Sequence, residues 1–271
     1  MSLRINNNLA SIAAQKSLTR TTRDLTQNYA RLSSGLRITR AADDAAGLGV
    51  SESLRADITS AKVAMRNTND GISLVNVAEG SMGEVHNMLN RMRELAMQSA
   101  SEVLSDTERA YLEDEFDELQ AEITRVAGDT EFNGIALTDG TNATLDVQVG
   151  FDSGDEISLT MADMSALGVL GTVGVDSAAN AQSALATIDT DIETVSGARA
   201  TLGAQQNRLV STFSNLQNYM ENLTAAESRI RDVDFASETA ELTKNQILQQ
   251  SGVSVLSQAN FAPQAALTLL G

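Results

Sequence analysis

The residue types that perform chemistry in proteins are scarce in this sequence and are not grouped. The chain has one histidine, His86, and no cysteine, so it lacks the several nitrogen and sulfur ligands of a zinc site. The carboxylate run at 113–118, EDEFDE, has neither the loop glycine nor the spacing of a calcium site. We interpret it as a solvated acidic face of a helix, and we expect neither a metal nor a cofactor.

The short motifs in the sequence are equally weak. Gly47-Leu48-Gly49 is a lone G-x-G that follows no predicted strand, so it does not predict a nucleotide site. The sequons at Asn142 and Asn222 are short matches of a kind that often occurs by chance. No residue is therefore predicted to be catalytic, and we expect that the protein is not an enzyme.

The clearest pattern is a heptad repeat over 177–233. Apolar residues recur at every seventh position: Ala181, Ile188, Val195, Leu202, Leu209, Leu216, Leu223 and Ile230. Two apolar positions in seven, kept up for this long, predict a long helix in a bundle of coiled-coil type. About 54 helical residues would extend over roughly 80 Å.

Two further helices are predicted before this one. An apolar stripe runs over about 45–99, and a third helix begins at Ser105, where Ser105 and Glu108 form a capping box. The three helices would share one rod-like core.

The segment between the third helix and the heptad repeat has a different character. Residues 145–149 and 157–161 alternate apolar and polar side chains, which predicts a β-hairpin, and no other segment is predicted to be a strand. The predicted fold class is mainly α: a long antiparallel helical bundle or coiled coil with a small β-hairpin region. The two terminal helices are expected to pair with each other as a coiled coil, because neither can bury its apolar stripe alone.

Charge is distributed unevenly along the chain. The formal net charge is −17, which argues against a general nucleic-acid binder. Residues 1–42 nevertheless hold seven Lys and Arg against a single Asp, a net of +6. A basic start can bind anionic lipid or nucleic acid, but these residues are dispersed, and we favour a helix that lies beside acidic neighbours in an assembly.

The last 27 residues, 245–271, carry no charged side chain at all. Lipid is one environment that would suit them, but their glutamines and asparagines suit a protein interface better, and a membrane anchor would normally be basic. No apolar segment has the length of a membrane span, so we expect no membrane insertion. The asparagines at 6–8 interrupt any secretory signal, so export would need another route.

Several stretches resemble the sequences of bacterial flagellins. The similar segments are RLSSGLRITRAADDAAGLGVSE (31–52), RNTNDGISLVNVAEGSMGEV (66–85), RMRELAMQSAS (91–101), TEFNG (130–134), SRIRDVDFASE (228–238) and SVLSQANFAPQAALTLLG (254–271). The resemblance covers about 1–139 and 177–271. In the remaining part, 140–176, the family is variable and only a hairpin is predicted, so the chain resembles a minimal flagellin that lacks large outer domains.

The resemblance implies a function that composition does not. Residues 1–44 with 233–271 would form a terminal coiled-coil domain in the filament core. Residues 45–232 would form a rod of three long helices that includes the variable hairpin region 140–176. The chain would polymerise with itself, and with any other flagellins present, into the extracellular flagellar filament used for motility. It would leave the cell by the flagellar type III pathway, after a cytoplasmic chaperone has covered its C-terminal segment.

Two sets of site residues follow from the resemblance. An animal Toll-like receptor would contact Asn90, Arg91, Leu95 and Glu115, unless Arg91 and Leu95 simply contact the next subunit. The polymerisation core would include Ile5, Leu9, Ile12, Leu32, Leu248, Val255, Leu256, Leu267, Leu269 and Leu270.

Two rival functions remain at this point. A flagellar hook–filament junction protein shares the N-terminal signature, but the NDGISL…AEG and QANFAPQ blocks match the filament subunit. A membrane-surface or partner-binding coiled-coil module would bind through its ends and never elongate.

Overall fold

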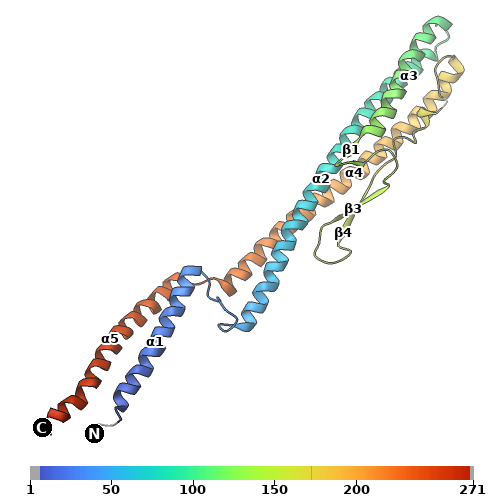
Figure 1. Cartoon of the computed structure of the whole chain (residues 1–271). Coiled ribbons are helices and arrows are strands. Elements are labelled where there is room, and N and C mark those ends of the chain that lie inside the picture. Colours follow the sequence, from blue (N-terminus) through green and yellow to red (C-terminus); the bar gives the residue numbers. More distant parts are fainter. Residues whose placement is uncertain (1–6, 172, 269–271) are drawn as a thin grey trace. The chain divides into compact units, whose positions relative to one another are not determined.

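The computed structural model of the chain describes residues 7–171 and 173–268, with residues 262–268 described by their backbone only. Five helices account for most of it (Figure 1): α1 (Leu9–Ser34), α2 (Ala45–Ser99), α3 (Asp106–Asp129), α4 (Ala178–Arg231) and α5 (Phe235–Thr268). The mainly α class with long packed helices is therefore confirmed. The chain forms two compact units, residues 58–221 and residues 1–57 with 222–271.

The heptad repeat of α4 becomes its buried face. Leu202 and Leu209 are at most 1% exposed, and the other repeat positions from Ala181 to Leu216 are buried as well. The repeat positions from Ala181 to Leu209 pack in one core with fully buried α2 side chains such as Leu89 and with Phe116 of α3. Side chains that return to one helix face every 3.5 residues pack in this way.

Helix α3 begins as the sequence predicts. The Glu108 backbone N–H donates to Ser105 Oγ (3.4 Å), and the Ser105 backbone N–H donates to Glu108 Oε2 (2.8 Å), which completes a capping box. Hydrogen bonds from Ser105 to the Glu108 carboxylate lower the pKa of Glu108. The box satisfies two of the N–H groups that a helix start leaves without partners.

The predicted hairpin is present, one residue earlier than expected. Strand β3 (Thr144–Gln148) pairs antiparallel with β4 (Glu156–Thr160), with Leu145 opposite Leu159 and Val147 opposite Ile157. These four apolar side chains belong to or pack against the core of residues 58–221. The alternation in the sequence is thus the alternation between a core face and a solvent face.

The prediction of a single strand region is wrong. Strands β1 (Glu131–Phe132) and β2 (Ile135–Ala136) form a second antiparallel hairpin. Asn133 and Gly134 connect them with φ of 52° and 76°, the positive values of a tight two-residue hairpin turn. Strands of two residues are too short to show alternation, which is why the pattern escaped detection.

Helix α4 also carries a row of hydroxyl side chains that bond to its own backbone. The Oγ or Oγ1 atoms donate to carbonyl oxygens four residues earlier, at 2.9–3.3 Å, from Ser183, Thr187, Thr190, Thr194, Thr201, Ser211 and Ser214. The receiving carbonyl groups lie within the helix, where each also accepts a backbone N–H.

The terminal unit is an antiparallel pair of helices, α1 and α5, which lie side by side (Figure 1). Helix α1 ends at Gly35, whose φ of 72° is the left-handed conformation that glycine adopts without strain. The Val233 N–H donates to Gly35 O at 3.0 Å, and the Arg37 N–H donates to Arg231 O at 2.6 Å. These bonds hold the end of α1 close to the start of α5.

Candidate functional site

The seam between α1 and α5 follows a heptad pattern on both helices. The residues that are buried or half-buried in it recur at alternating spacings of three and four: Ser11, Ala14, Leu18, Thr21, Leu25, Asn28 and Leu32 on α1, and Glu238, Leu242, Asn245, Gln249, Gly252, Leu256 and Ala259 on α5. This is the spacing of a coiled-coil pair. The predicted pairing of the terminal helices as a coiled coil is confirmed.

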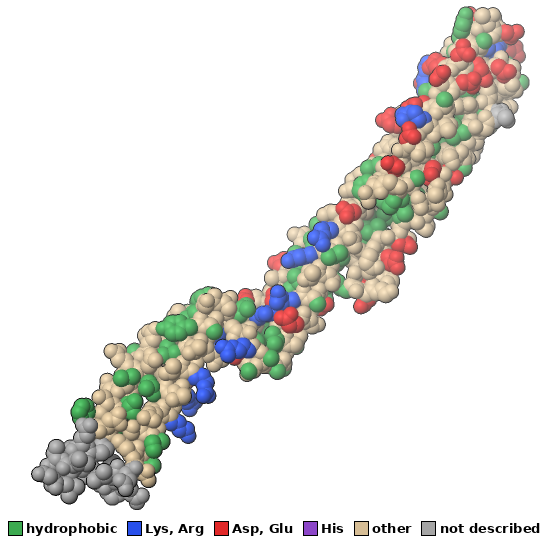
Figure 2. Space-filling view, in the orientation of Figure 1, with side chains coloured by type: hydrophobic (Ala, Val, Ile, Leu, Met, Phe, Trp, Pro, Cys, Tyr) green, Lys and Arg blue, Asp and Glu red, His purple; other side chains and the backbone are tan. Residues whose placement is uncertain are grey.

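The remaining surface of these two helices is unusually apolar. Large hydrophobic side chains between 48% and 67% exposed project from them: Leu9, Ile12, Tyr29, Phe235, Ile247, Leu248, Val253, Val255 and Phe261. Figure 2 shows hydrophobic side chains interrupting the polar surface of this unit. Large exposed apolar side chains that gather on one unit are candidates for contact with another molecule.

The predicted core residues divide between these two surfaces. Leu9, Ile12, Leu248 and Val255 are exposed, whereas Leu32 and Leu256 lie half-buried in the seam. Three others, Ile5, Leu269 and Leu270, lie outside the described residues, and of Leu267 only the backbone position in α5 is described. The assignment of all ten to a polymerisation core stays a prediction.

Four of the exposed apolar residues were missed by sequence reasoning: Phe235, Ile247, Val253 and Phe261. A heptad template assigns the regular positions to a seam and leaves the others without a role. The absence of charge over 245–271 was the signal that could have found Ile247, Val253 and Phe261. An uncharged stretch has no charged face that must stay in water, so its apolar side chains on every face are candidates for contact.

The predicted receptor contact centres on an ion pair. Arg91 Nε donates to Glu115 Oε1 at 2.8 Å and Arg91 Nη1 donates to Glu94 Oε2 at 3.0 Å. These bonds, the one with Glu115 first, raise the pKa of Arg91 above its ordinary value. Asn90 is exposed on the neighbouring position of α2, but Leu95 is 1% exposed and belongs to the core. The structure thus brings Arg91 and Glu115 together, whereas Leu95 is buried and has no exposed surface for contact with a receptor.

The residues singled out for chemistry do not assemble into a reactive site. Nδ1 of His86 is buried without a hydrogen-bond partner. Among residues 7–171 and 173–268, no three His, Cys, Asp or Glu side chains converge to hold a metal ion. The Asn142 Nδ2 of the first sequon donates to Ala136 O at 3.0 Å.

One carboxylate of the 113–118 run has a structural partner. Glu113 accepts a hydrogen bond from the Val175 backbone N–H. Burial raises the pKa of Glu113, the Val175 N–H opposes this, and the nearby Asp117, Asp176 and Asp114 raise it further. The carboxylate therefore holds the segment that precedes α4 against α3.

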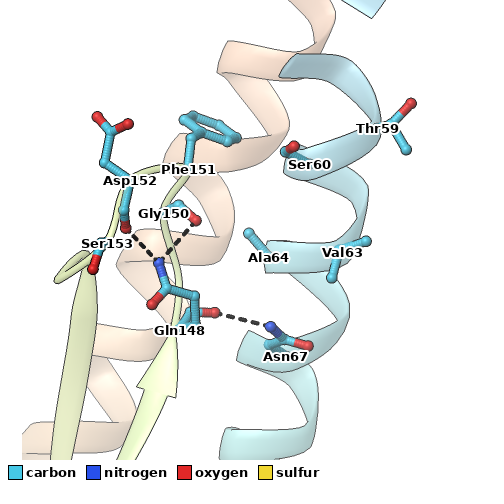
Figure 3. A pocket seen from close by; sticks show the side chains of 10 residues that line it. All are labelled: Thr59, Ser60, Val63, Ala64, Asn67, Gln148, Gly150, Phe151, Asp152 and Ser153. Atoms are coloured by element: carbon cyan, nitrogen blue, oxygen red, sulfur yellow. Dashed lines mark hydrogen bonds between the residues drawn. The ribbon is translucent and has the colours of Figure 1, made fainter. Parts of the chain in front are cut away.

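A pocket of about 420 Å³ lies between α2 and the tip of the β3–β4 hairpin (Figure 3). Asn67 Nδ2 donates to Gln148 O at 3.1 Å across it, and Gln148 Nε2 donates to Gly150 O and Asp152 O. Its lining has one carboxylate, Asp152, and no histidine or lysine. General acid–base chemistry needs a group of suitable pKa beside a second polar group, and this pocket has no such pair.

No helix in the described part of the chain combines the length and apolar character needed to cross a bilayer.

Comparison with known proteins identifies the family to which these helices belong. The model of the bacterial flagellin N-terminal helical region matches residues 5–143, and that of the bacterial flagellin C-terminal helical region matches residues 185–270. A flagellin of Halalkalibacterium halodurans is 48% identical over 269 residues, which cover 98% of this chain and 99% of the relative. A flagellin of Bacillus subtilis is 41% identical over 303 residues, covering 99% of this chain and 100% of the relative.

Solved structures show the same fold. The crystal structure of Bacillus cereus flagellin has a TM-score of 0.53 and 32% identity, over 60% of this chain and 94% of that one. A putative flagellar hook-associated protein from Vibrio parahaemolyticus has a TM-score of 0.61 at 16% identity, over 70% of this chain and 100% of that one. The latter likeness is one of fold alone. Both flagellin regions are present and only residues 144–184 separate them, so this chain belongs to the bacterial flagellin family, as a small member without a large outer domain.

Proposed function

We propose that this flagellin is a structural subunit, without catalytic activity, that polymerises with copies of itself into the extracellular flagellar filament used for motility. The observation that carries this proposal is the apolar surface that α1 and α5 leave exposed, with nine large side chains at least 48% accessible. Burying each such side chain fully against a neighbour would contribute roughly 1.5–3 kcal/mol. A chain that exposes this much apolar area gains most by contact with copies of itself.

The role that we propose for each part of the chain follows from this surface. Residues 1–44 with 233–271 form the part that contacts neighbouring subunits in the filament core. Residues 45–232 form the rod, whose three helices already bury a continuous core of their own. The family relationship supports export by the flagellar type III pathway and a cytoplasmic chaperone, which would cover the uncharged C-terminal segment. The hook–filament junction alternative has only the fold likeness in its favour.

Electron microscopy of the full-length protein tests the proposal. Purified chain, seeded with filament fragments, should grow into long filaments of uniform width. The variant I247Q/V253Q/V255Q, which makes three exposed positions of α5 polar, should stay helical and fail to elongate. The control I247V/V253I/V255I keeps these positions apolar and should elongate like the parent. Growth of the glutamine variant at the parental rate would contradict the proposal.

Recognition by an animal Toll-like receptor is a second function, and the exposed ion pair of Arg91 with Glu115, which we call the Arg91 patch, favours it. The guanidinium of Arg91 is about half exposed and held against Glu115, and a positioned, amphipathic Arg is a common centre of binding energy. R91A should lower the receptor signal of the purified chain. R125A, which removes an Arg equally engaged with carboxylates on the surface of α3, should leave the signal unchanged. Equal loss in both variants would show that the patch is not specific.

A further inference from the structure

The α1–α5 pair is most deeply buried where it is polar. Among the described residues of α1 and α5, those under 10% exposed are Ser11, Leu25, Asn28 and Asn245, and only Leu25 is apolar. The large apolar side chains mostly project outward instead. This inverts the usual distribution, in which buried positions are apolar and polar groups are exposed.

Two of these buried polar side chains, those of Asn28 and Asn245, are connected with two half-buried charged side chains. We call the set the amide ladder: Asn28, Arg31, Glu238 and Asn245. Asn245 Nδ2 donates to Asn28 Oδ1 at 3.0 Å, and Asn28 Nδ2 donates to Glu238 Oε1 at 2.7 Å. Glu238 Oε2 lies 3.8 Å from Arg31 Nη1, and the Glu238 side chain is only 12% exposed. Every step of the ladder joins the two helices.

Such a ladder contributes more to the choice of partner than to stability. A buried amide or carboxylate without a partner costs free energy, whereas a paired one is close to neutral compared with an apolar side chain. A single buried Asn is known to fix the register and partner of coiled coils at a cost in stability. The hydrogen bonds that join the two Asn amides to the Glu238 carboxylate form only when α1 meets an α5 in this register, and Arg31 Nε stays buried without a hydrogen-bond partner even there.

Pairs of like helices would leave the ladder unsatisfied. In a parallel pair of α1 helices, the two copies of Asn28 could bond, but Arg31 would face its own copy. In a parallel pair of α5 helices, Glu238 would face another Glu238 while both are largely removed from water. Like charges in such positions are a device against the wrong partner, and the apolar seam residues alone carry no such preference.

We propose that the amide ladder is the specificity determinant that commits α1 to pair with α5 and forbids pairing of like helices between copies. The backbone bonds from Val233 to Gly35 and from Arg37 to Arg231 keep the two helix ends together, which favours the α5 of the same chain by effective concentration. The exposed apolar side chains then remain free. The proposal rests on the seam itself and does not require filament growth.

The absence of cysteine makes a cross-linking test clean. Ser11 Oγ and Asn260 Oδ1 lie 2.9 Å apart, so the reporter S11C/N260C in full-length soluble chain should join α1 to α5 within one molecule when treated with a short bis-maleimide. The single reporter N260C can cross-link only between copies, and it detects pairing of like α5 helices. Both reporters are read by intact mass and by denaturing gel electrophoresis.

The ladder is then replaced by an apolar seam in N28L/E238L/N245L. We expect dimers of the N260C reporter to rise by about tenfold, because the cost of one unsatisfied buried amide corresponds to a factor of about 5 to 150. The control T22L/S254L/Q258L adds one leucine to α1 and two to α5 at exposed positions and should leave dimers at the parental level. Dimers that stay at that level in the ladder variant would overturn the proposal, as would a parent without the intramolecular cross-link.

A charge-swap pair covers the case in which the leucine variant fails to fold. R31E places a second carboxylate beside Glu238 and should abolish the intramolecular cross-link. R31E/E238R restores opposite charges and should recover it, which a merely structural role for either side chain would not do. The Asn28 amide can rotate to offer its oxygen to the new guanidinium. Failure of the swap to recover the cross-link would refute the ladder as the specificity determinant.

Discussion

Gly47 is a residue at which the structure leaves no room for a methyl group. A Cβ there would lie 2.5 Å from Asp44 Oδ2 and 2.8 Å from Ile38 Cδ1. Ile38 is 1% exposed, so it cannot move aside freely. Two residues later, a Cβ on Gly49 would meet nothing within 4 Å. The G-x-G motif is therefore one packing glycine and one unconstrained glycine.

The two glycines should respond to alanine with opposite signs. We expect G47A to lower the free energy of unfolding by about 1–3 kcal/mol, as overpacking does. G49A should raise it by up to about 1 kcal/mol, since alanine is the better helix former. Chemical denaturation followed by circular dichroism measures both. A G47A protein as stable as its G49A control would mean that Ile38 and Asp44 yield to the added methyl group.

Glu113 should make the stability of residues 58–221 depend on pH. Burial and three neighbouring carboxylates raise its pKa above the ordinary value of 4.5, so ionisation costs the folded state free energy. Its contribution is fully present below the unfolded pKa and is lost as the pH rises through the folded pKa. The melting temperature of E113Q should therefore fall less than that of the parent between about pH 4 and pH 7.

The amide oxygen of E113Q can still accept the Val175 N–H, so only the charge is removed. E118Q, which changes an exposed carboxylate absent from the groups that shift Glu113, is the control and should follow the parent. If the melting temperatures of E113Q and E118Q depended on pH in the same way, the raised pKa of Glu113 would not be the cause of the pH-dependent stability.

At the residue scale, the sequence shows which reactive residue types are present but not which residues are exposed for contacts. A single histidine and no cysteine are properties of the sequence itself. The exposure of Ile247 or the burial of Leu95 depends on which face each helix turns toward its neighbour. The amide ladder was not predictable either, because Asn28 and Asn245 are separated by 217 positions and neither stands out in its own segment.

At the scale of elements, long helices were predictable because each carries a sustained period. The range 45–99 agrees with α2, and 177–233 agrees with α4 within two residues at either end. The β1–β2 hairpin escaped because its strands have two residues each, and its Asn-Gly turn was read only as part of a family signature. Periodicity needs several repeats to be visible, whereas a turn needs only two residues.

The buried row of α4 should carry most of that helix's stability. L202A removes a side chain that is 1% exposed and should lower the free energy of unfolding by about 2–5 kcal/mol through the cavity it leaves. V210A changes a side chain on the same helix that is 49% exposed and should stay within about 0.5 kcal/mol of the parent. Urea denaturation of the two variants gives both values, and equal losses would refute the assignment of the buried face.

At the scale of the whole molecule, the proposed function would divide stability and assembly between the two compact units. The core of residues 58–221 draws on α2, α3, α4 and both hairpins, and none of its residues lies beyond position 221. The paired helices α1 and α5 instead expose apolar side chains. The fold class of both parts was predictable from the sequence, whereas the inverted seam was not, because a heptad template assumes apolar contacts.

Deletion of 245–271 tests this division. The truncated chain should remain helical, and the melting transition of residues 58–221 should be unchanged, because their core is complete without the tail. Filament growth should be lost, because the deleted part includes five of the exposed apolar side chains, from Ile247 to Phe261. Calorimetry and electron microscopy give the two readings. Filaments grown from the truncated chain would show that the tail is dispensable.

The hydroxyl row of α4 has a mechanical consequence. A carbonyl oxygen that accepts both a backbone N–H and a threonine Oγ1 holds each more loosely, and such bonds bend helices. Seven such carbonyl groups are spaced from Ala179 to Val210, so flexural compliance is distributed along the helix rather than concentrated at a kink. We expect such a helix to bend slightly and elastically under load and to return to its original form when the load is removed.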